Sequence, residues 1–402
     1  MEGNLPSVLH QRRYGILKRK RVRIRYMREE ASMLEVRTAV SSDKEAYRDL
    51  WRICFGDSED FMDWFFSERF FPEFSSCLLE DGAIMSALQS YPLHIRIRNR
   101  IVPVSMLAGV STHPERNGRG YMKQIFSHYM QRVRASNIPI AIHTPAHLTT
   151  FFSRGHYPAT DTLHLTLEEA RSPNLPKETA PHDLYRDLGP LQVCYQKATA
   201  HYSGMVSRTV ADFAYKMRDY ASDGARCLTV TSGADVLGYC VYYVTEDRVH
   251  AEECFALDQE TLATLLNALC YEAAGRKLHV KLPPDASVHL PGAILERRPQ
   301  GVMGIANVSQ ALSLLLSDPS YVFEVIDKTV PENEGVWDGT GNRTTRAPQI
   351  RLEAGRLGQF LCGYRSFSEL SSGGEAEVID LAAAKALDAA FPKQTCFITD
   401  EY

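Results

Sequence analysis

The sequence predicts an α/β (α+β) protein with more than one domain, and three observations carry this prediction. Short segments such as "LEVRTA" and "DTLHLTL" alternate apolar and polar residues, which is typical of half-buried strands. Between such segments, apolar residues recur every three or four positions, as they do in amphipathic helices. The chain has 402 residues, well above the roughly 100–200 residues of a usual single domain. We therefore expect two or three mixed domains.

Residues 1–32 form a basic segment ahead of the first predicted strand. They hold nine Lys and Arg against three acidic residues, whereas the rest of the chain holds 36 basic and 46 acidic residues. The run "KRKRVRIRYMRE" is open to three interpretations: a flexible solvated tail, an extension upstream of a start at Met27 or Met33, and an arm that binds nucleic acid. We expect a flexible extension, because the acidic body is a poor surface for nucleic acid. The same acidity favours a cationic substrate.

The composition argues against several classes of protein. No apolar run approaches the roughly 18–20 residues that span a bilayer, and the N-terminus lacks the apolar stretch of a signal peptide. Nine cysteines are scattered singly, with no CxxC pair, which argues against a disulfide framework and a zinc site. We expect a cytoplasmic protein with reduced thiols, no bound metal and no membrane partner.

The elements of the first region follow in order. "SSDKEAYRDLWRICF" predicts a helix with Ser41 or Ser42 as its N-cap, supported by Glu45. "SALQSYPLHIRIRNRIVPVSMLAGVST" predicts two strands joined by a turn at residues 98–100. "IPIAIHT" predicts a buried strand of a parallel sheet. The helix before it carries a buried stripe at Met122, Ile125, Phe126, Tyr129, Met130 and Val133.

A stretch rich in proline and charge, residues 168–183, predicts a linker. Behind it, "DFAYKMRDYA" and "ETLATLLNALCYEAA" predict helices, while "CLTVTS" and "VLGYCVYYV" predict strands, so a second α/β region follows. "RRPQGVMGIANVSQALSLL" opens a third region, with further helices near "LGQFLCGY" and "AAAKALDAAF". We place the three domains at residues 33–170, 171–300 and 301–402.

The segment "HPERNGRGYMKQIF" combines a strand end, a glycine turn and a helix start. The first N–H groups of a helix lack intrahelical partners and carry partial positive charge, so such an arrangement binds anions. Gly118 and Gly120 allow close backbone approach, and Arg116, Arg119 and Lys123 add charge for phosphate. Neither a Walker loop nor a GxGxxG fingerprint is present. Alone, the pattern fits a connecting turn as well as a phosphate cradle.

With its neighbours, this segment resembles the GCN5-related N-acetyltransferase (GNAT) superfamily, whose acetyl-CoA motif is [RQ]xxGx[GA]. Asn117 and Met122 depart from that motif at its two ends. A bulky aliphatic residue at the second of these positions is similar to the Eis (enhanced intracellular survival) branch. "HYPATDTLHLTL", "FLCGYRSFSEL", "LDAAFPK" and the final "FITDEY" also resemble that branch. The resemblance covers residues 34–402 and implies tandem GNAT folds followed by a sterol-carrier-protein-like domain.

The resemblance implies an acetyl-CoA site in the first domain. The strand end would present backbone groups to the pantetheine arm and the thioester carbonyl, at Val110, Ser111 and Thr112. The turn and the helix start would hold the pyrophosphate, at Gly118, Arg119, Gly120, Tyr121, Met122 and Lys123. Ala146 and His147, after the next strand, would flank the far side of the pantetheine. In the second domain, "FALDQETLATLL" lacks the glycine turn, so we expect that copy to bind no cofactor.

The resemblance also implies a reaction. A primary amine of polyamine, aminoglycoside or lysine type would attack the thioester directly, after losing a proton. The base would be the C-terminal carboxylate of Tyr402, with Glu401 beside it to attract a cation. Asp57 and Trp64 resemble the acidic and aromatic groups of the family's amine pocket, although the apolar neighbours of Trp64 favour a core position. Family members assemble, so we expect a homo-oligomer.

Phe151 occupies the position at which related acetyltransferases carry a tyrosine that acts as the general acid, in a pattern like FYxxxG[FYW]. It has no hydroxyl to donate to the departing thiolate. Tyr157, His156 and a water molecule are the alternatives, and the sequence does not select among them. Two functions follow: an acetyl-CoA-dependent N-acetyltransferase, which we favour, and a CoA-binding regulatory protein with weak or no catalysis.

Overall fold

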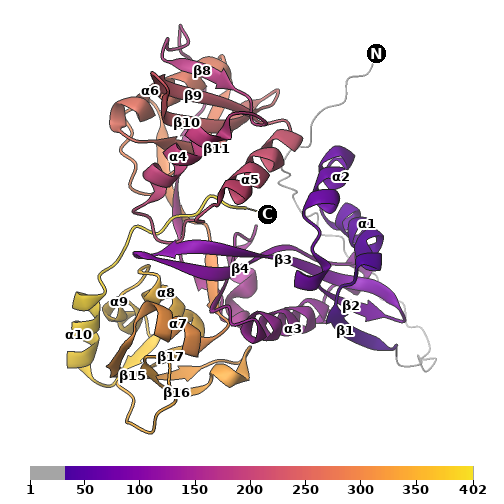
Figure 1. Ribbon diagram of the computed structural model, residues 1–402, viewed down its shortest axis with the longest axis vertical. Coiled ribbons are helices and arrows are strands. Elements are labelled where there is room, and N and C mark those ends of the chain that lie inside the picture. Colours follow the sequence, from indigo (N-terminus) through magenta and orange to yellow (C-terminus); the bar gives the residue numbers. More distant parts are fainter. Residues whose placement is uncertain (1–31, 402) are drawn as a thin grey trace, which may run out of the picture. The chain divides into compact units, whose positions relative to one another are not determined.

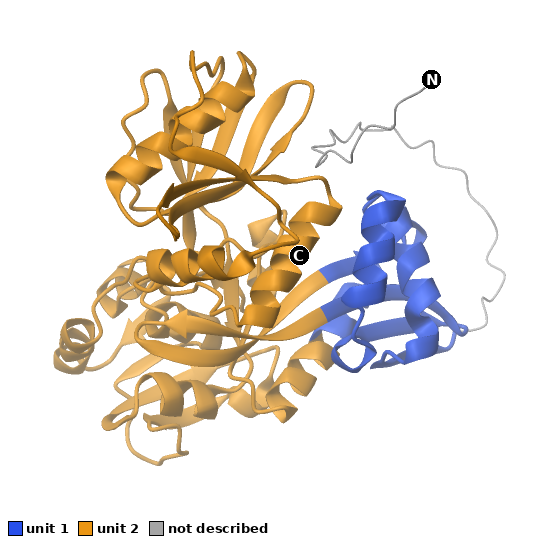
Figure 2. Ribbon diagram, turned by 45° about the horizontal axis from the view of Figure 1, so that its top comes forward, with its two compact units in different colours: residues 1–89, 109–126 blue, residues 90–108, 127–402 orange. Residues whose placement is uncertain are grey.

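The computed structural model describes residues 32–401 and divides the chain into two compact units (Figure 2). Unit 1 comprises the chain up to Gln89 together with Gly109–Phe126, and unit 2 comprises Ser90–Ala108 and Ser127–Tyr402. The basic segment up to residue 31 and the whole of residue 402 lie outside the described residues. Helices and strands are mixed throughout both units, which confirms the predicted α/β class (Figure 1).

Unit 1 combines an antiparallel sheet with two helices. Strand β2 pairs with β1 on one side and with β3 on the other, antiparallel to both. Helices α1 and α2 meet through aromatic side chains, since the ring of Trp51 lies 4.6 Å from those of Phe55 and Phe65. The elements are β1 (Leu34–Thr38), η1 (Ser41–Asp43), α1 (Lys44–Cys54), α2 (Glu59–Glu68), η2 (Pro72–Phe74), β2 (Ser76–Glu80), β3 (Ala83–Ile97), β4 (Arg100–Thr112), η3 (Pro114–Arg116) and α3 (Tyr121–Ala135), of which β3, β4 and α3 continue into unit 2.

The start of α1 differs from the predicted serine cap. Ser41 and Ser42 lie in the 3-10 turn η1, and Asp43 directly precedes the helix. The Asp43 carboxylate accepts the Val40 N–H at 2.8 Å and binds both terminal nitrogens of Arg37 at 2.6 and 2.9 Å. The hydrogen bonds from Arg37 lower the pKa of Asp43. The two oxygens of the Asp43 carboxylate accept hydrogen bonds from the turn and from Arg37 at the same time. A serine hydroxyl has only one oxygen and no charge to pair with the arginine.

In unit 2, strand β5 (Ile140–His143) lies beside β4 and parallel to it, with Val104 opposite Ile140. This confirms the parallel strand predicted for "IPIAIHT". Strand β14 (Val302–Ile305) lies between β5 and β6 (Tyr157–Pro158) and is antiparallel to both. All four residues of β14 are buried. A short, wholly apolar strand carries no signal of which sheet it will join, so its partners were not predictable.

A second sheet in unit 2 has the strand order β13-β7-β12-β11-β10-β9-β8. Helix α6 packs on one face with the cluster around Leu165, Val249 and Leu265, and helices α4 and α5 pack on the other with Phe213 and Tyr239. The elements are β7 (Asp161–Leu167), β8 (Thr179–His182), α4 (Leu188–Thr199), α5 (Val210–Ser222), β9 (Arg226–Ser232), β10 (Asp235–Val244), β11 (Arg248–Ala256), α6 (Gln259–Ala273), β12 (Lys277–Leu282) and β13 (Ile294–Pro299).

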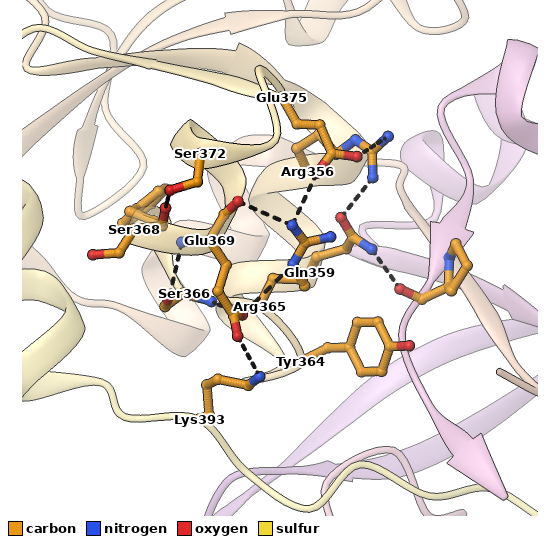
Figure 3. Close-up of polar contacts among 12 residues, drawn as sticks. Arg356, Gln359, Tyr364, Arg365, Ser366, Ser368, Glu369, Ser372, Glu375 and Lys393 are labelled. Carbon is orange, nitrogen blue, oxygen red and sulfur yellow. Dashed lines mark hydrogen bonds and ion pairs between the residues drawn. The ribbon is translucent and has the colours of Figure 1, made fainter. Parts of the chain in front are cut away.

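The last region of unit 2 builds a four-stranded sheet of order β16-β15-β17-β18. Ion pairs tie its helices to the segments that connect them: Arg356 and Arg365 bind Glu375 at 2.7 and 3.0 Å, and Lys393 binds Glu369 at 2.7 Å (Figure 3). The elements are α7 (Val308–Leu315), β15 (Asp318–Ile326), η5 (Pro331–Asn333), β16 (Gly335–Gly339), β17 (Ile350–Glu353), α8 (Ala354–Leu361), α9 (Phe367–Ser372), β18 (Ala376–Val378) and α10 (Leu381–Ala390).

Candidate active site

The glycine turn lies between η3 and α3, as the sequence predicts. Gly118 and Gly120 have φ angles of 81° and 80°, a region that side-chain-bearing residues rarely adopt. A Cβ atom added at either position would meet nothing within 4 Å. The requirement for glycine is therefore one of backbone conformation, and the space beside the turn leaves room for a ligand to approach the backbone.

The N-terminus of α3 offers hydrogen-bond donors at this turn. The N–H of Gln124 donates to the carbonyl of Gly120 at 3.3 Å, so the amides of Tyr121, Met122 and Lys123 precede the first α-helical hydrogen bond. The helix is 15 residues long, and its aligned peptide dipoles add partial positive charge at this end. The arrangement suits a phosphate group.

Glu80 is an acidic residue behind the turn that the sequence pattern did not reveal. It accepts a hydrogen bond from Arg116 Nε and lies 3.5 Å from Arg119, and its side chain is 4% exposed. The hydrogen bond from Arg116 lowers the pKa of Glu80. Arg116 is thus committed to holding the turn against β2. Arg119 is 52% exposed and Lys123 is also exposed, so these two cations remain accessible to a ligand.

The end of β4 is shaped by one glycine. Gly109 has a φ of 55°, and a Cβ atom there would lie 2.3 Å from Cζ3 of Trp51. The Trp51 indole is therefore packed directly onto the strand backbone. Trp51 Nε1 in turn donates to the carboxylate of Asp57 at 2.8 Å. The Trp51 indole therefore orients Asp57, the residue predicted to bind the substrate amine. Trp51 is not among the site residues that the sequence predicts.

Past Met106, β4 extends beyond its pairing with β5. The parallel register covers Val104–Met106, whereas the strand continues to Thr112. On the other edge, the Ser86 hydroxyl contacts both the carbonyl of Ser111 and the hydroxyl of Thr112 at 2.8 Å. Ser86 of β3 thus holds one edge of Val110–Thr112. The other edge of this stretch lies beyond the residues of β4 that pair with β5.

Trp64 and Gln89 add buried polar atoms to unit 1. Trp64 is partly buried, 6.2 Å from the ring of Phe61, and its Nε1 has no hydrogen-bond partner among the described residues. Gln89 is 1% exposed, and neither end of its amide has a partner in the described part of the chain. Buried polar groups in proteins are normally satisfied. Gln89 is therefore a candidate ligand-contacting residue, and no sequence motif marks it.

Unit 2 carries the other predicted site residues. Ala146 is exposed, and His147 precedes the 3-10 helix η4 (Leu148–Arg154). Phe151 is buried within η4, and its ring packs edge-on against His143 at 4.3 Å. The aromatic ring at the expected tyrosine position therefore serves as packing for a histidine of β5.

The alternatives to a tyrosine acid are constrained by their neighbours. The Tyr157 hydroxyl donates to the Glu353 carboxylate, and burial raises the pKa of Tyr157 to about 12. His156 lies 3.1 Å from His143, and burial lowers the pKa of His156 to about 3 and that of His143 well below its usual value. Both histidines are neutral at physiological pH. Neither these imidazoles nor the Tyr157 phenol is an acid matched to neutral pH.

Glu401 is bound rather than free. Its carboxylate accepts hydrogen bonds from Lys281 at 2.7 Å and from Gln300, and its backbone carbonyl accepts one from Lys216 at 3.0 Å. The side chain is 34% exposed. Its negative charge is therefore shared with Lys281 before any substrate cation approaches.

The described residues contain neither a candidate membrane span nor a candidate metal site. In residues 32–401, no helix is long and apolar enough to cross a membrane. Over the same range, no cluster of three or more His, Cys, Asp or Glu side chains is arranged to hold a metal ion.

Comparison with protein families identifies two segments of the chain. The model of acetyltransferase (GNAT) domains matches residues 35–158, and the model of sterol carrier protein domains matches residues 308–399. The first segment contains β4, the glycine turn and η4, and the second begins at α7. A search of curated proteins finds no match.

Solved structures with a similar fold cover most of the chain. They include a conserved protein of unknown function from Enterococcus faecalis V583, described as a probable N-acyltransferase (16% identity, TM-score 0.77). A GCN5-related N-acetyltransferase from Anabaena variabilis ATCC 29413 (15%, 0.74) and Eis1 from Mycobacterium abscessus (16%, 0.70) are also similar. Each comparison covers 92% of this chain and 100% of the other. At such identities the similarity shows the fold, which agrees with the predicted resemblance.

Proposed function

This chain carries a GNAT-type N-acetyltransferase domain joined to a sterol carrier protein domain, and from this premise we propose that it transfers an acetyl group from acetyl-CoA to a cationic primary amine. One observation carries the proposal most strongly. The glycine turn at the N-terminus of α3, with Gly118 and Gly120 open to solvent and Arg119 and Lys123 exposed, fits a pyrophosphate. GNAT domains use acetyl-CoA as co-substrate, and the residues present here suit it.

The proposed site assigns three tasks to the chain. Gly118–Lys123 bind the pyrophosphate, and the free edge of Val110–Thr112 receives the pantetheine arm, flanked by Ala146 and His147. Backbone N–H groups of the same strand end stabilise the oxyanion that forms when the amine attacks the thioester carbon. The tetrahedral intermediate then expels the CoA thiolate, which leaves without a protein nucleophile being modified.

The amine must lose a proton before it attacks, because a lysine-like ammonium has a pKa of about 10.4. We propose that the carboxylate of Tyr402 accepts this proton and that Asp57 and Trp64 receive the amine. The Trp51–Asp57 hydrogen bond supports this role for Asp57, because it fixes the carboxylate while leaving it half-buried. The substrate class is a polyamine, an aminoglycoside-like amine or a lysine side chain.

We propose that the three predicted domains have different roles. Residues 33–170 bind acetyl-CoA, residues 171–300 form a second GNAT-like domain without cofactor, and residues 301–402 deliver the C-terminus. The protein is proposed to work as a cytoplasmic homo-oligomer. Charge supports an amine substrate over nucleic acid, because the chain beyond residue 32 holds ten more acidic than basic residues.

Phe151 favours a second candidate function, a CoA-binding regulatory protein with weak or no catalysis. A thiol-release assay with acetyl-CoA and a panel of amines decides between the two. We expect turnover by the wild type and a rate increase of roughly 10- to 100-fold for Phe151→Tyr, toward the gain that a positioned general acid gives. Tight acetyl-CoA binding without turnover by either protein would replace the enzyme with the regulatory function.

Removal of Tyr402 tests the base separately. Without the carboxylate at this position, turnover should fall by roughly 100-fold or more. The affinity for acetyl-CoA, measured by calorimetry, should stay the same, because the glycine turn lies elsewhere in the chain. Unchanged turnover in the shortened protein would eliminate Tyr402 as the base and leave the acetyl-CoA site standing.

A further inference from the structure

Unit 2 contains a cavity of about 230 Å³ that shares no lining residue with the proposed acetyl-CoA site. Its walls are the end of η4, the loop between β15 and η5, and the start of α8. A cavity of this size lies slightly below the roughly 300–1,000 Å³ of sites for drug-sized ligands, so it suits a small metabolite. The charged residues that line it are Arg154, Asp327, Lys328 and Glu353.

The walls of this cavity are in direct contact with one another. The hydroxyl of Thr329, in the loop after β15, donates to the carbonyl of Arg154 at 3.1 Å. At the start of α8, a Cβ atom added to Gly355 would collide with the carbonyl oxygen of Gly155. The end of η4 therefore touches both other walls, and the cavity is enclosed by segments that pack within one unit.

Two cations at this cavity have no acidic partner. Arg154 is partly buried, and its Nε is shielded from solvent without a hydrogen-bond partner in the described part of the chain. Lys328 is exposed, and neither cation forms an ion pair with any residue in 32–401. Buried polar groups are normally hydrogen-bonded and buried charges are normally paired. A ligand with acceptor oxygens would satisfy the guanidinium.

The carboxylates at the cavity, by contrast, already have donors. Asp327 accepts two backbone N–H groups and the side-chain amide of Asn333, all at 2.9 Å. Burial raises the pKa of Asp327, which weakens its negative charge further. Glu353 accepts a hydrogen bond from the Tyr157 hydroxyl. The hydrogen-bonding capacity that the protein leaves unused here is therefore that of donors, which favours an anionic ligand.

The start of α8 adds further donors to the same wall. Glu353 stands at the N-cap position of this helix, yet its side chain does not cap it and instead binds Tyr157. The first turn of the helix contains no acidic residue. The first N–H groups of a helix lack intrahelical partners and carry partial positive charge. This helix end therefore reinforces the field of Arg154 and Lys328.

A neighbouring cavity of about 410 Å³, which shares part of its lining with the first, provides a contrast. Its arginines are paired with acids. Arg351 binds Glu324 at 2.9 Å and Glu377 at 2.8 Å, and Arg356 binds Glu375 at 2.7 Å (Figure 3). Cations without acidic partners therefore distinguish the smaller cavity from the larger one.

We propose that the smaller cavity binds the phosphate group of a small phosphate monoester. The guanidinium of Arg154 matches two phosphate oxygens, Lys328 supplies a second charge, and the first amides of α8 bind a third oxygen. Three separate groups of donors suit a tetrahedral phosphate better than a carboxylate, which has only two oxygens. Arg154 lies in the segment matched by GNAT domains and Lys328 in the segment matched by sterol carrier domains, so the ligand bridges the two. The inference does not depend on acetyl transfer.

The test measures the affinity of the full chain for inorganic phosphate by calorimetry, with sodium chloride keeping the ionic strength constant. We expect Arg154→Gln to weaken binding roughly 10- to 100-fold, as the loss of hydrogen bonds between charged groups implies. Lys328→Gln should weaken it less, because Lys328 is exposed. Arg154→Lys should fall between the wild type and Arg154→Gln, since it keeps the charge and loses the planar fork.

Controls separate this site from other sources of phosphate binding. Arg351→Gln changes an arginine of the neighbouring cavity and should leave the phosphate affinity unchanged. The glycine turn is a second place for phosphate, so a binding event there should be lost in Lys123→Gln and retained in Arg154→Gln. Melting curves without phosphate check that each variant folds. Arg154→Gln removes no ion pair with a described residue, so we expect it to fold.

Every outcome bears on the proposal. Phosphate binding that requires Arg154 and Lys328, but not Arg351, supports it. Equal phosphate affinities for the wild type and a folded Arg154→Gln overturn it, as does a wild type that binds no phosphate. Citrate serves as a carboxylate comparison. Tighter binding of citrate than of phosphate, with the same dependence on Arg154, would overturn the assignment to a phosphate group.

Discussion

Gly109 carries two constraints at once, one from its backbone and one from its neighbour. Its φ of 55° is unfavourable for residues with a side chain, and the Trp51 indole occupies the place of a Cβ atom. Gly118, with a φ of 81°, carries only the first constraint, because nothing lies within 4 Å of its Cβ position. The two glycines look alike in the sequence, and their neighbours alone distinguish them.

Gly109→Ala should therefore destabilise the protein more than Gly118→Ala. We expect a loss of about 2–4 kcal/mol in the free energy of unfolding for Gly109→Ala, from left-handed strain and overpacking against Trp51. Gly118→Ala should lose only about 1–2 kcal/mol, from strain alone. Urea unfolding of both variants measures the difference. Equal losses would mean that Trp51 moves aside without cost.

The His143–His156 pair links β5 to the residue that precedes β6. Both imidazoles are fully buried, and the 3.1 Å contact between them requires one ring to donate and the other to accept. Burial lowers the pKa of His156 to about 3 and that of His143 well below its usual value. In the unfolded chain, both titrate near about 6.5.

Acid should therefore destabilise the folded protein through these residues. Their contribution is complete above pH of about 6.5 and is lost as the pH falls toward the folded values, because the unfolded state then binds more protons. Each histidine contributes a slope of roughly 1.4 kcal/mol per pH unit in that window. Urea unfolding of the wild type and His156→Gln between pH 4.5 and 7.5 should show a shallower slope for the variant. Parallel slopes would mean that His156 is protonated in the folded state.

The elements themselves were largely predictable, because their signals are local. The stripe on α3 is buried at Ile125, Phe126, Tyr129, Met130 and Val133, as expected from a helical period, whereas Met122 at the start of the predicted stripe is only partly buried. The strand "DTLHLTL" was expected to be half-buried, yet its first five residues are all buried. On its polar face, His164 lies 3.0 Å from His279 of the neighbouring strand β12. Alternation of apolar and polar residues identifies a strand, but it does not reveal which residues will contact the polar face of that strand.

Across the whole molecule, the sequence predicted the glycine turn and the order of the acetyltransferase and sterol carrier segments, since both depend on contiguous residues. It did not predict Glu80 behind Arg116, the Trp51–Asp57 hydrogen bond or the unsatisfied amide of Gln89. Each of these depends on residues that the fold brings together, and no motif connects them. The same holds for the buried ion pair between Arg208 and Asp400, whose Nε and Oδ1 atoms lie 3.3 Å apart in space although the two residues are 192 positions apart in the sequence.

That separation has a consequence for how the protein is made. Residues 395–401, whose Phe397 packs in the same cluster as Phe255, are synthesised after every strand of the sheet that carries this cluster, so β9–β12 emerge from the ribosome before Arg208 can bind both Glu253 and Asp400. Contacts between residues so far apart in sequence form late and slow folding, because the intervening chain must first be ordered. Until residues 395–401 arrive, this domain is an incomplete intermediate with exposed apolar surface around Phe255. Refolding yield should therefore depend on how soon residues 395–401 cover the apolar cluster around Phe255.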